Sequence, residues 1–170
     1  MWSINFKNWK AIIDLFTCLD CRKKHGKIYE IDEYVLDEPP LHWKCRCKIE
    51  PMEAKMAGTA TKLKENGADW WLRNLGRLPD YYITKEEALA LGDKPLFGNL
   101  DVVAPGKVLT KSVYQNRNGH LPSKEGRIWY EADINYNPKW GYRGGDRILF
   151  SNDGLIFVTY NHYHTFVEIV

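Results

Sequence analysis

The sequence predicts an α+β protein, in which helices pack on one face of a C-terminal antiparallel β-sheet and a small cysteine-rich module precedes them. Helix patterns come before strand patterns in the C-terminal part, an order typical of an α+β layer. All four cysteines lie at or before Cys47, which predicts two units, residues 1–58 and 59–170. Apolar residues make up 44% of the 170 residues, enough for a packed core.

Charge and hydropathy narrow the classes of function. The chain has 24 Lys and Arg against 22 Asp and Glu, and its net charge of +2 does not by itself indicate a nucleic-acid binder. No segment reaches the roughly 18 uninterrupted apolar residues of a membrane-spanning helix, so we expect no membrane partner. The first residues lack a basic segment leading into an apolar run, so no signal peptide is predicted.

In the N-terminal unit, apolar spacing predicts a helix, a strand and a second helix. The predicted helix over residues 4–16 rests on the helical spacing of four side chains: Trp9, Ile12, Ile13 and Phe16. A strand is expected over residues 27–31, and the adjacent Pro39 and Pro40 end regular structure. Residues 52–64 are expected to be largely helical.

The cysteines form two close pairs that suit a structural zinc site. A Cys-x2-Cys pair supplies two ligands to a tetrahedral zinc, and a second pair completes the site. A small segment with few apolar residues gains stability from such a staple. Disulfides in an exported protein, or free thiols, fit the same pattern. The expected ligands are Cys18, Cys21, Cys45 and Cys47, with His25 and His42 in reserve.

The same segment carries a recognisable frame. Thr-Cys-Leu-Asp-Cys-Arg-Lys-Lys-His-Gly begins at Thr17, and Pro-Pro-Leu-His-Trp-Lys-Cys-Arg-Cys begins at Pro39. Over residues 5–52 this frame resembles the Cys/His-rich end of phage Mu F-like head morphogenesis (minor head) proteins. In that family such an end can precede a toxin-like domain, so the resemblance implies that residues 1–55 belong to a carrier module.

The C-terminal unit shows helix signals first and strand signals afterwards. A helix is expected over residues 60–75 with Gly76 as its C-cap, and Thr84 with Glu87 forms a capping box for the next helix. The turn at residues 151–154 predicts a hairpin. Strand composition recurs over residues 108–114, 127–136, 147–151, 155–160 and 165–170.

Polar side chains gather on the face of this sheet that the helices leave free. Strand alternation places Glu131 and Asp133 on one face. Arg143 and Arg147 bracket a glycine turn that enters a strand, and His162 precedes the last strand. A carboxylate base, an imidazole acid and guanidinium groups suit phosphoryl chemistry without a catalytic metal. Taken singly, each residue also fits a solvated side chain or an ordinary ion pair.

An ordered series of segments then points to a family. The series includes Leu78-Pro-Asp-Tyr-Tyr-Ile-Thr-Lys-Glu-Glu-Ala, Asn116-Arg-Asn-Gly, Trp129-Tyr-Glu-Ala-Asp-Ile, Arg143…Asp-Arg-Ile-Leu and His162-Tyr…Thr-Phe. From about residue 62 to the C-terminus the chain resembles the small bacterial guanyl-preferring ribonucleases, the barnase-like (microbial ribonuclease N1/T1) family. The resemblance implies a barnase-like fold and an endoribonuclease that cleaves RNA to a 2′,3′-cyclic phosphate.

The resemblance also implies a role for each matched residue. Glu131 matches the general base that takes the 2′-OH proton, and His162 matches the acid that protonates the leaving 5′-oxygen. Tyr163 matches an aromatic that contacts the nucleotide, and Asp133 an aspartate that holds the arginines. The cations that match the phosphate-binding set are Lys85, Arg143 and Arg147. The 2′-OH requirement predicts that DNA is not cut.

The base-recognition loop departs from the family pattern. The substrate-binding loop is Gln115, Asn116, Arg117 and Asn118. Asn118 stands where the family has an acidic residue, and an amide offers guanine one carbonyl and no charge. We therefore expect a weakened guanine preference. A second departure is the connector at residues 137–140, which is longer than in the family.

Three functions are compatible with these features. The first is an extracellular or delivered endoribonuclease toxin, carried on a phage-like module and opposed by a small acidic barstar-like inhibitor that covers the cations. The second is a capsid-associated zinc and RNA-binding protein whose nuclease-like domain does not cut. The third is a secreted nutritional ribonuclease, which fits the domain but not the cysteine-bearing extension.

Overall fold

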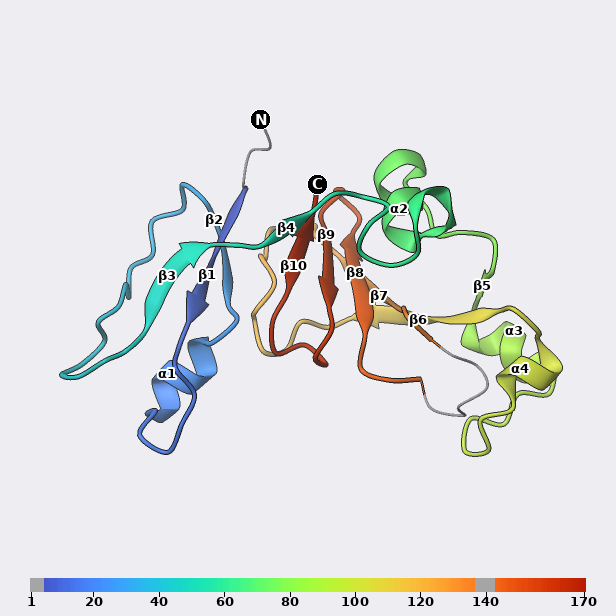
Figure 1. The fold of residues 1–170 in the computed structure, drawn as a ribbon, viewed down its shortest axis with the longest axis horizontal. Coiled ribbons are helices and arrows are strands. Elements are labelled where there is room, and N and C mark those ends of the chain that lie inside the picture. Colours follow the sequence, from blue (N-terminus) through green and yellow to red (C-terminus); the bar gives the residue numbers. More distant parts are fainter. Residues whose placement is uncertain (1–4, 137–142) are drawn as a thin grey trace.

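The computed structural model describes residues 5–136 and 143–170, so the connector at residues 137–140 lies outside the described residues. The chain forms two β-sheets that lie next to each other (Figure 1). One has three strands in the order β2-β1-β3, and the other has seven in the order β4-β10-β9-β8-β7-β6-β5. Within the described ranges, no helix is both long enough and apolar enough to span a membrane.

The N-terminal sheet contains a strand where apolar spacing predicted a helix. β1 (Phe6–Lys10) pairs antiparallel with β2 (Ile28–Glu30) and with β3 (Lys48–Pro51). The prediction of a helix over residues 4–16 is therefore wrong, and Phe16 of its apolar stripe is 88% exposed. Pairing on both edges of β1 satisfies its backbone, which outweighs a short periodic pattern. The strand predicted over residues 27–31 is confirmed by β2.

The helix predicted over residues 52–64 is also wrong. β4 (Ala54–Lys55) instead pairs parallel with the last strand of the large sheet. The turn that follows is held by the buried carboxylate of Asp69, which accepts hydrogen bonds from the backbone N–H of Gly58 at 2.7 Å and of Ala60 at 2.9 Å. This long-range cap holds the backbone in a turn. The 3-10 helix η1 (Lys64–Asn66) then leads into the first long helix.

The helices of the C-terminal unit are close to those predicted. The helix expected over residues 60–75 begins only at Ala68, and Gly76 ends it in the left-handed region with φ 67°. The capping box of Thr84 is present, because its side chain and that of Glu87 bond each other's backbone N–H. The three α-helices of this part are α2 (Ala68–Leu75), α3 (Lys85–Ala90) and α4 (Leu100–Val103).

The five predicted strands form the centre of the large sheet, where each strand pairs antiparallel with the one that follows it in the chain. They are β6 (Val108–Tyr114), β7 (Trp129–Asp133), β8 (Arg147–Ser151), β9 (Ile156–Thr159) and β10 (Val167–Ile169). The predicted hairpin at residues 151–154 joins β8 to β9, with Gly154 at φ 94°. The short β5 (Tyr82–Ile83) adds in parallel to β6. The α+β class is confirmed.

The two faces of this sheet are covered differently. On one face α2 packs through Leu72 against side chains such as Ile148 and Val158. On the other face the N-terminal unit contributes Phe6, Ile28 and Met52 to one core cluster with Trp129, Leu149 and Phe157. We call this second face the shared face, because its apolar end lies under the N-terminal unit while its polar end carries Glu131, Asp133 and Arg147. The predicted site residues lie on this face, at its polar end, and the cover of its apolar end by the N-terminal unit was not expected. The proposed boundary between residues 58 and 59 stays a prediction.

Candidate active site and thiol cluster

A buried carboxylate organises the cations at the polar end of the shared face. Asp133 is fully buried and faces Arg147 across the β7–β8 pair. Its Oδ1 lies 3.0 Å from Nε of Arg147, and its Oδ2 lies 3.3 Å from Nη1 of Arg143. Arg147 Nη1 also donates to the carbonyl of Gly144 at 3.0 Å. One buried negative charge thus orients two guanidinium groups and leaves Arg143 partly exposed toward solvent.

The loop after β9 places an imidazole and a phenol over the same strands. His162 and Tyr163 both adopt the left-handed backbone region, with φ 54° and 69°. The turn at Gly145 lies so close that an added Cβ would be 3.1 Å from Cβ of His162, so this approach favours glycine. The Tyr163 hydroxyl donates to Oε2 of Glu131 at 2.5 Å, and its ring stacks on Tyr114 at 5.3 Å. Burial, followed by the carboxylate, raises the pKa of Tyr163.

Lys85 enters the site from the opposite wall. It is the first residue of α3, directly after the capping residue Thr84. A cleft of about 1010 Å³ separates this helix start from the polar end of the shared face. The structure brings all five residues predicted to be catalytic to its lining: Lys85, Glu131, Arg143, Arg147 and His162.

A second pocket, of about 640 Å³, adjoins the first and shares Glu131 and His162 with it. It is lined by Tyr163 and by the whole predicted base-recognition loop, Gln115, Asn116, Arg117 and Asn118. The Asn116 side chain closes this loop, because its Nδ2 donates to the carbonyl of Leu121 at 2.8 Å and its Oδ1 accepts from the Leu121 N–H at 3.1 Å. Arg117 Nε donates to Gln115 Oε1 at 2.6 Å.

This arrangement matches a known family in sequence. Residues 71–170 match the ribonuclease family. A ribonuclease of Heyndrickxia coagulans is 52% identical over 102 residues, which are 60% of this chain and 91% of that protein. The chain belongs to the ribonuclease family. Ribonucleases of Bacillus intermedius and Bacillus pumilus are also 52% identical over 102 residues, and the chain spans 61% of the length of each.

Membership in the ribonuclease family confirms the predicted enzyme class, an endoribonuclease acting on RNA. Two residues of the site were not selected from the sequence. Tyr114 stacks on Tyr163, and Gly145 lies against His162. No alternating pattern indicates Tyr114, because the pairing register of β6 with β7 shifts between Thr110 and Val113. The close approach of Gly145 arises from the tertiary structure, and no local pattern signals it.

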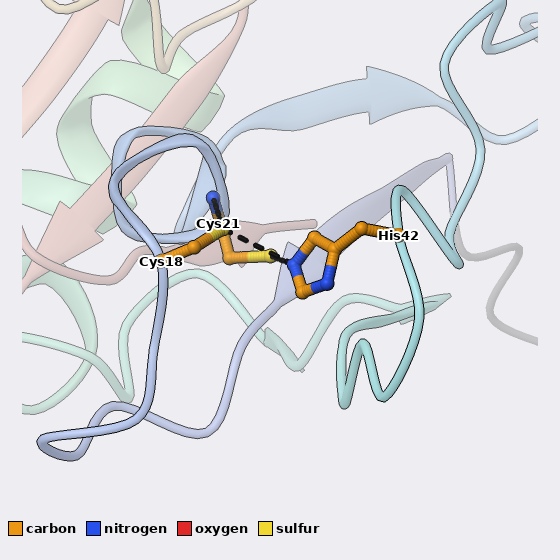
Figure 2. Close-up of side chains that lie close together, drawn as sticks. All are labelled: Cys18, Cys21 and His42. Atoms are coloured by element: carbon orange, nitrogen blue, oxygen red, sulfur yellow. Dashed lines mark hydrogen bonds between the residues drawn. The ribbon is translucent and has the colours of Figure 1, made fainter.

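The predicted zinc ligands of the N-terminal unit form two close groups that share Cys21, and His42 joins one of them. Figure 2 shows that group, Cys18, Cys21 and His42. The imidazole Nε2 lies 3.2 Å from Sγ of Cys18 and 3.4 Å from Sγ of Cys21. Cys21 Sγ in turn lies 3.8 Å from Sγ of Cys45, and Cys47 completes a second close group. All four cysteines are free thiols. The reserve ligand His25 instead accepts a hydrogen bond from the Ala11 N–H at Nδ1, 3.1 Å away.

The groups of this cluster differ in protonation: burial and the neighbouring thiols raise the pKa of Cys21, whereas hydrogen bonds lower the pKa of Cys18 and of Cys45. The His42 Nδ1–H donates to the Trp43 carbonyl at 2.8 Å, so Nε2 presents its lone pair toward the thiols. The same bond is the main cause that raises the pKa of His42, so a metal at Nε2 would have to displace a proton there. Burial opposes ionisation of Cys45, but hydrogen bonds from backbone groups and neighbouring thiols lower its pKa to about 7. The Cys21 backbone N–H likewise lowers the pKa of Cys18.

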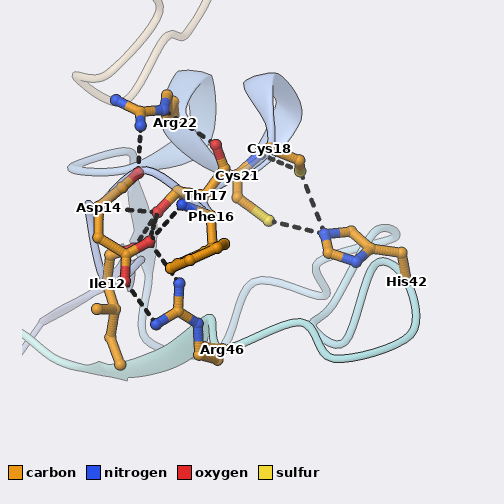
Figure 3. Close-up of polar contacts among 9 residues, drawn as sticks. All are labelled: Ile12, Asp14, Phe16, Thr17, Cys18, Cys21, Arg22, His42 and Arg46. Carbon is orange, nitrogen blue, oxygen red and sulfur yellow. Dashed lines mark hydrogen bonds and ion pairs between the residues drawn. The ribbon is translucent and has the colours of Figure 1, made fainter.

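A polar network fixes the loop in front of the thiols (Figure 3). Arg46 makes a two-pronged ion pair with Asp14, with distances of 2.6 and 2.7 Å. Arg22 donates to the backbone carbonyls of Asp14 and Thr17. Cys18 caps the start of α1 (Leu19–Lys24), which carries Cys21. Residues 3–50 match the phage Mu protein F like family, so the resemblance of this unit is confirmed.

Proposed function

We propose that this ribonuclease cleaves single-stranded RNA by transesterification to a 2′,3′-cyclic phosphate without a catalytic metal. Glu131 takes the proton of a ribose 2′-OH, and the oxygen attacks the adjacent phosphorus. His162 protonates the 5′-oxygen as its bond to phosphorus breaks. The cyclic phosphate is then hydrolysed with the two roles exchanged. Lys85, Arg143 and Arg147 stabilise the charge that builds on the phosphate; the carboxylate of Asp133 supports both arginines.

One observation carries this proposal: the base pocket and the cation-lined cleft share Glu131 and His162. A nucleotide with its base in the smaller pocket and its phosphate in the larger cleft would place its ribose between these two side chains. The 2′-OH and the 5′-oxygen then flank the phosphorus near a base and an acid. The Tyr163 hydroxyl holds Glu131 at one oxygen, which leaves the other for the proton transfer.

The proposal includes a relaxed base preference. Asn118 offers an amide where a carboxylate would accept from two adjacent guanine donors. Backbone donors around Asn116 and Arg117 still line the pocket, and the Gln115 side chain is held by Arg117. Guanine is therefore favoured, but less sharply than in the family. Cleavage of all four homopolymeric RNAs, with the guanine polymer cleaved fastest, supports the relaxed site. Strict cleavage after guanine contradicts the relaxation, and equal cleavage of all four contradicts the remaining preference.

We further propose a structural zinc in the N-terminal module, bound by four of five candidate ligands. The candidates are Cys18, Cys21, His42, Cys45 and Cys47. Thiolate and imidazole are the ligands that tetrahedral structural zinc prefers. The bound ion would fasten α1 to the chain around Cys45. It takes no part in the cleavage step.

The biological context that fits best is a toxin-like domain on a phage-derived carrier. Such an enzyme acts outside its producer or after delivery into a target cell, where association with a phage particle is one route. A producer of an active ribonuclease needs protection. We therefore propose a small acidic barstar-like inhibitor that binds over Lys85, Arg143 and Arg147 and blocks the cleft.

Digestion of single-stranded RNA with the purified chain, with and without EDTA, tests the reaction. We expect cleavage in EDTA, product ends that carry a 2′,3′-cyclic phosphate, and no cleavage of single-stranded DNA of the same sequence. RNA binding without cleavage would instead support the alternative of a capsid-associated zinc and RNA-binding protein. Product ends without the cyclic phosphate would contradict the proposed mechanism.

A further inference from the structure

The N-terminal module touches the base-recognition loop directly. The Ile28 N–H at the start of β2 donates to the carbonyl of His120 at 2.8 Å. The His120 imidazole reaches back, with Nε2 3.3 Å from the carbonyl oxygen of Lys23 in the last turn of α1. Between these two contacts lies Gly26, where an added Cβ would be 2.4 Å from the carbonyl oxygen of His164. The α1–β2 turn is therefore packed against both loops that line the base pocket.

His120 links this turn to the residue that departs from the family pattern. Its Nδ1 lies 3.1 Å from Nδ2 of Asn118, and its backbone N–H donates to Asn118 Oδ1 at 3.2 Å. An amide nitrogen only donates, so Nδ1 must carry the lone pair. The proton then lies on Nε2, which points at the Lys23 carbonyl. One neutral imidazole thus binds Asn118 with one nitrogen and the module with the other.

The surroundings favour this neutral state. Burial is the main cause that lowers the pKa of His120, and the nearby side chains of His164 and Lys27 act in the same direction. The backbone carbonyls of Lys23 and Tyr163 act in the opposite direction. The amide of Asn118 is therefore held by His120 at both its oxygen and its nitrogen.

We propose that the Cys/His module is a second support of the base-recognition loop, and that His120, which itself lines the base pocket, is the positioning residue that joins them. The loop contains left-handed positions at Asn116 and Gly119 and is anchored in the core through Leu121, which is 1% exposed. The rest of the loop is held by hydrogen bonds. Those at His120 are made with α1 and β2 of the module. The module thereby sets how well the enzyme uses the base of its substrate. This inference rests on the proposed RNA cleavage.

The test compares two substrates that differ only in the base. One is guanylyl-3′,5′-adenosine, and the other carries hydrogen in place of the guanine on the same ribose phosphate. The ratio of their kcat/KM values measures the contribution of the base, while the abasic substrate alone reports the chemistry. The loss of a neutral hydrogen bond predicts that His120→Ala lowers this ratio about two- to tenfold and leaves abasic cleavage unchanged. Glu125→Ala, an exposed position beyond the loop, is the matched control.

Two amide variants separate the module from the loop. Asparagine places its amide near the position of Nδ1 and glutamine near that of Nε2. His120→Asn can still contact Asn118 but does not reach Lys23, so we expect it to behave as His120→Ala. His120→Gln keeps the reach to Lys23 and should recover part of the ratio.

Each other result overturns the inference. A wild-type ratio in His120→Asn means that the loop does not need the module. An equal loss on both substrates means that His120 only maintains the fold, and a wild-type ratio near one means that the loop does not use the base. Failure of the unmodified chain to cleave either substrate would instead reject the proposed function itself. Gly26→Ala changes the module instead of the loop, because the added Cβ must displace the turn from His164. We expect it to lower the ratio of the two kcat/KM values as His120→Ala does.

Discussion

The ribonuclease domain buries apolar side chains on both faces of its sheet, whereas the N-terminal module buries one small cluster of its own around Trp9. Large apolar side chains of the module such as Leu15 and Phe16 are 95% and 88% exposed. The module instead gathers four cysteines and His42 around Cys21 and places three apolar residues on the neighbouring sheet. The domain is thus held by apolar packing on both faces of its sheet, whereas the module has a small core of its own and packs on its neighbour. The proposed zinc would supply what that small core does not.

The two regions also differ in their part in the proposed RNA cleavage. Every residue proposed to take part in catalysis belongs to the ribonuclease domain, and the two regions meet on the shared face. Its apolar end, at Trp129 and Leu149, is covered by the module, and its polar end, at Glu131 and Asp133, opens to the cleft. Changes at the polar end should therefore remove activity, and changes in the module should alter it less.

The largest effect is expected at Glu131 and His162. Glu131→Gln can still accept the hydrogen bond from Tyr163 but does not take up a proton, and His162→Ala removes the acid. Each should lower kcat/KM on RNA by about 10²- to 10⁴-fold, the usual contribution of general acid or base catalysis. Steady-state cleavage assays measure the loss, and circular dichroism checks that the fold is retained. Full activity of either variant rejects its assigned role.

The second largest effect is expected at Asp133, where a substitution should lower both the stability of the fold and the rate of RNA cleavage. Asp133→Asn removes the buried charge between Arg143 and Arg147 and leaves a guanidinium group uncompensated. Breaking such a pair typically costs about 3–5 kcal/mol. Urea denaturation should show that loss in the free energy of unfolding, and RNA cleavage should fall because the arginines lose their support. Arg127 pairs with Asp153 outside the cleft, so Asp153→Asn is the control, with a smaller loss of stability and near-normal cleavage.

These two regions also differ in how far their sequences predicted their structures. In the ribonuclease domain, local signals agree with the fold: the Thr84 capping box, the Gly76 cap and the strands that alternate around Glu131 appear where expected. In the module, the spacing of Trp9 and Phe16 suggested a helix, but strand pairing with distant residues decided the outcome. Long-range pairing of this kind is not encoded in a short periodic pattern.

The candidate sites show the same division. The cleft residues could be named because ordered segments of the family carry them, and the two thiol pairs could be named from spacing alone. The participation of His42 depends on how its loop folds over Cys18, and the contact of His120 with Lys23 joins residues 97 positions apart. The cover of the shared face by Phe6 was not predictable, because it needs the relative placement of two units.

Removal of the proposed zinc sharpens the comparison by acting on the module alone. We expect about one zinc per chain by elemental analysis, and a chelator should lower the melting temperature of the module while the ribonuclease domain remains folded. RNA cleavage should persist in EDTA. Cys21→Ser should reduce zinc content most, because Cys21 belongs to both close groups of ligands, and Cys47→Ser less. A zinc-free chain with an unchanged melting profile would contradict the structural role.

The smallest effect is expected where the two regions are tied by a hydrogen bond. Glu168 on β10 is buried, and its Oε1 accepts from Asn5 Nδ2 at 2.7 Å. Burial raises the pKa of Glu168, although Asn5 and then Arg73 oppose this. A carboxyl group whose pKa is higher in the folded chain stabilises the fold below its unfolded pKa of about 4.3, and this contribution is lost as the pH rises through the folded pKa. Glu168→Gln should therefore melt at a higher temperature than the unmodified chain at pH 7, and the difference should disappear at pH 4. A variant that is less stable at pH 7 would mean that the charged carboxylate strengthens the link to Asn5 by more than its burial costs.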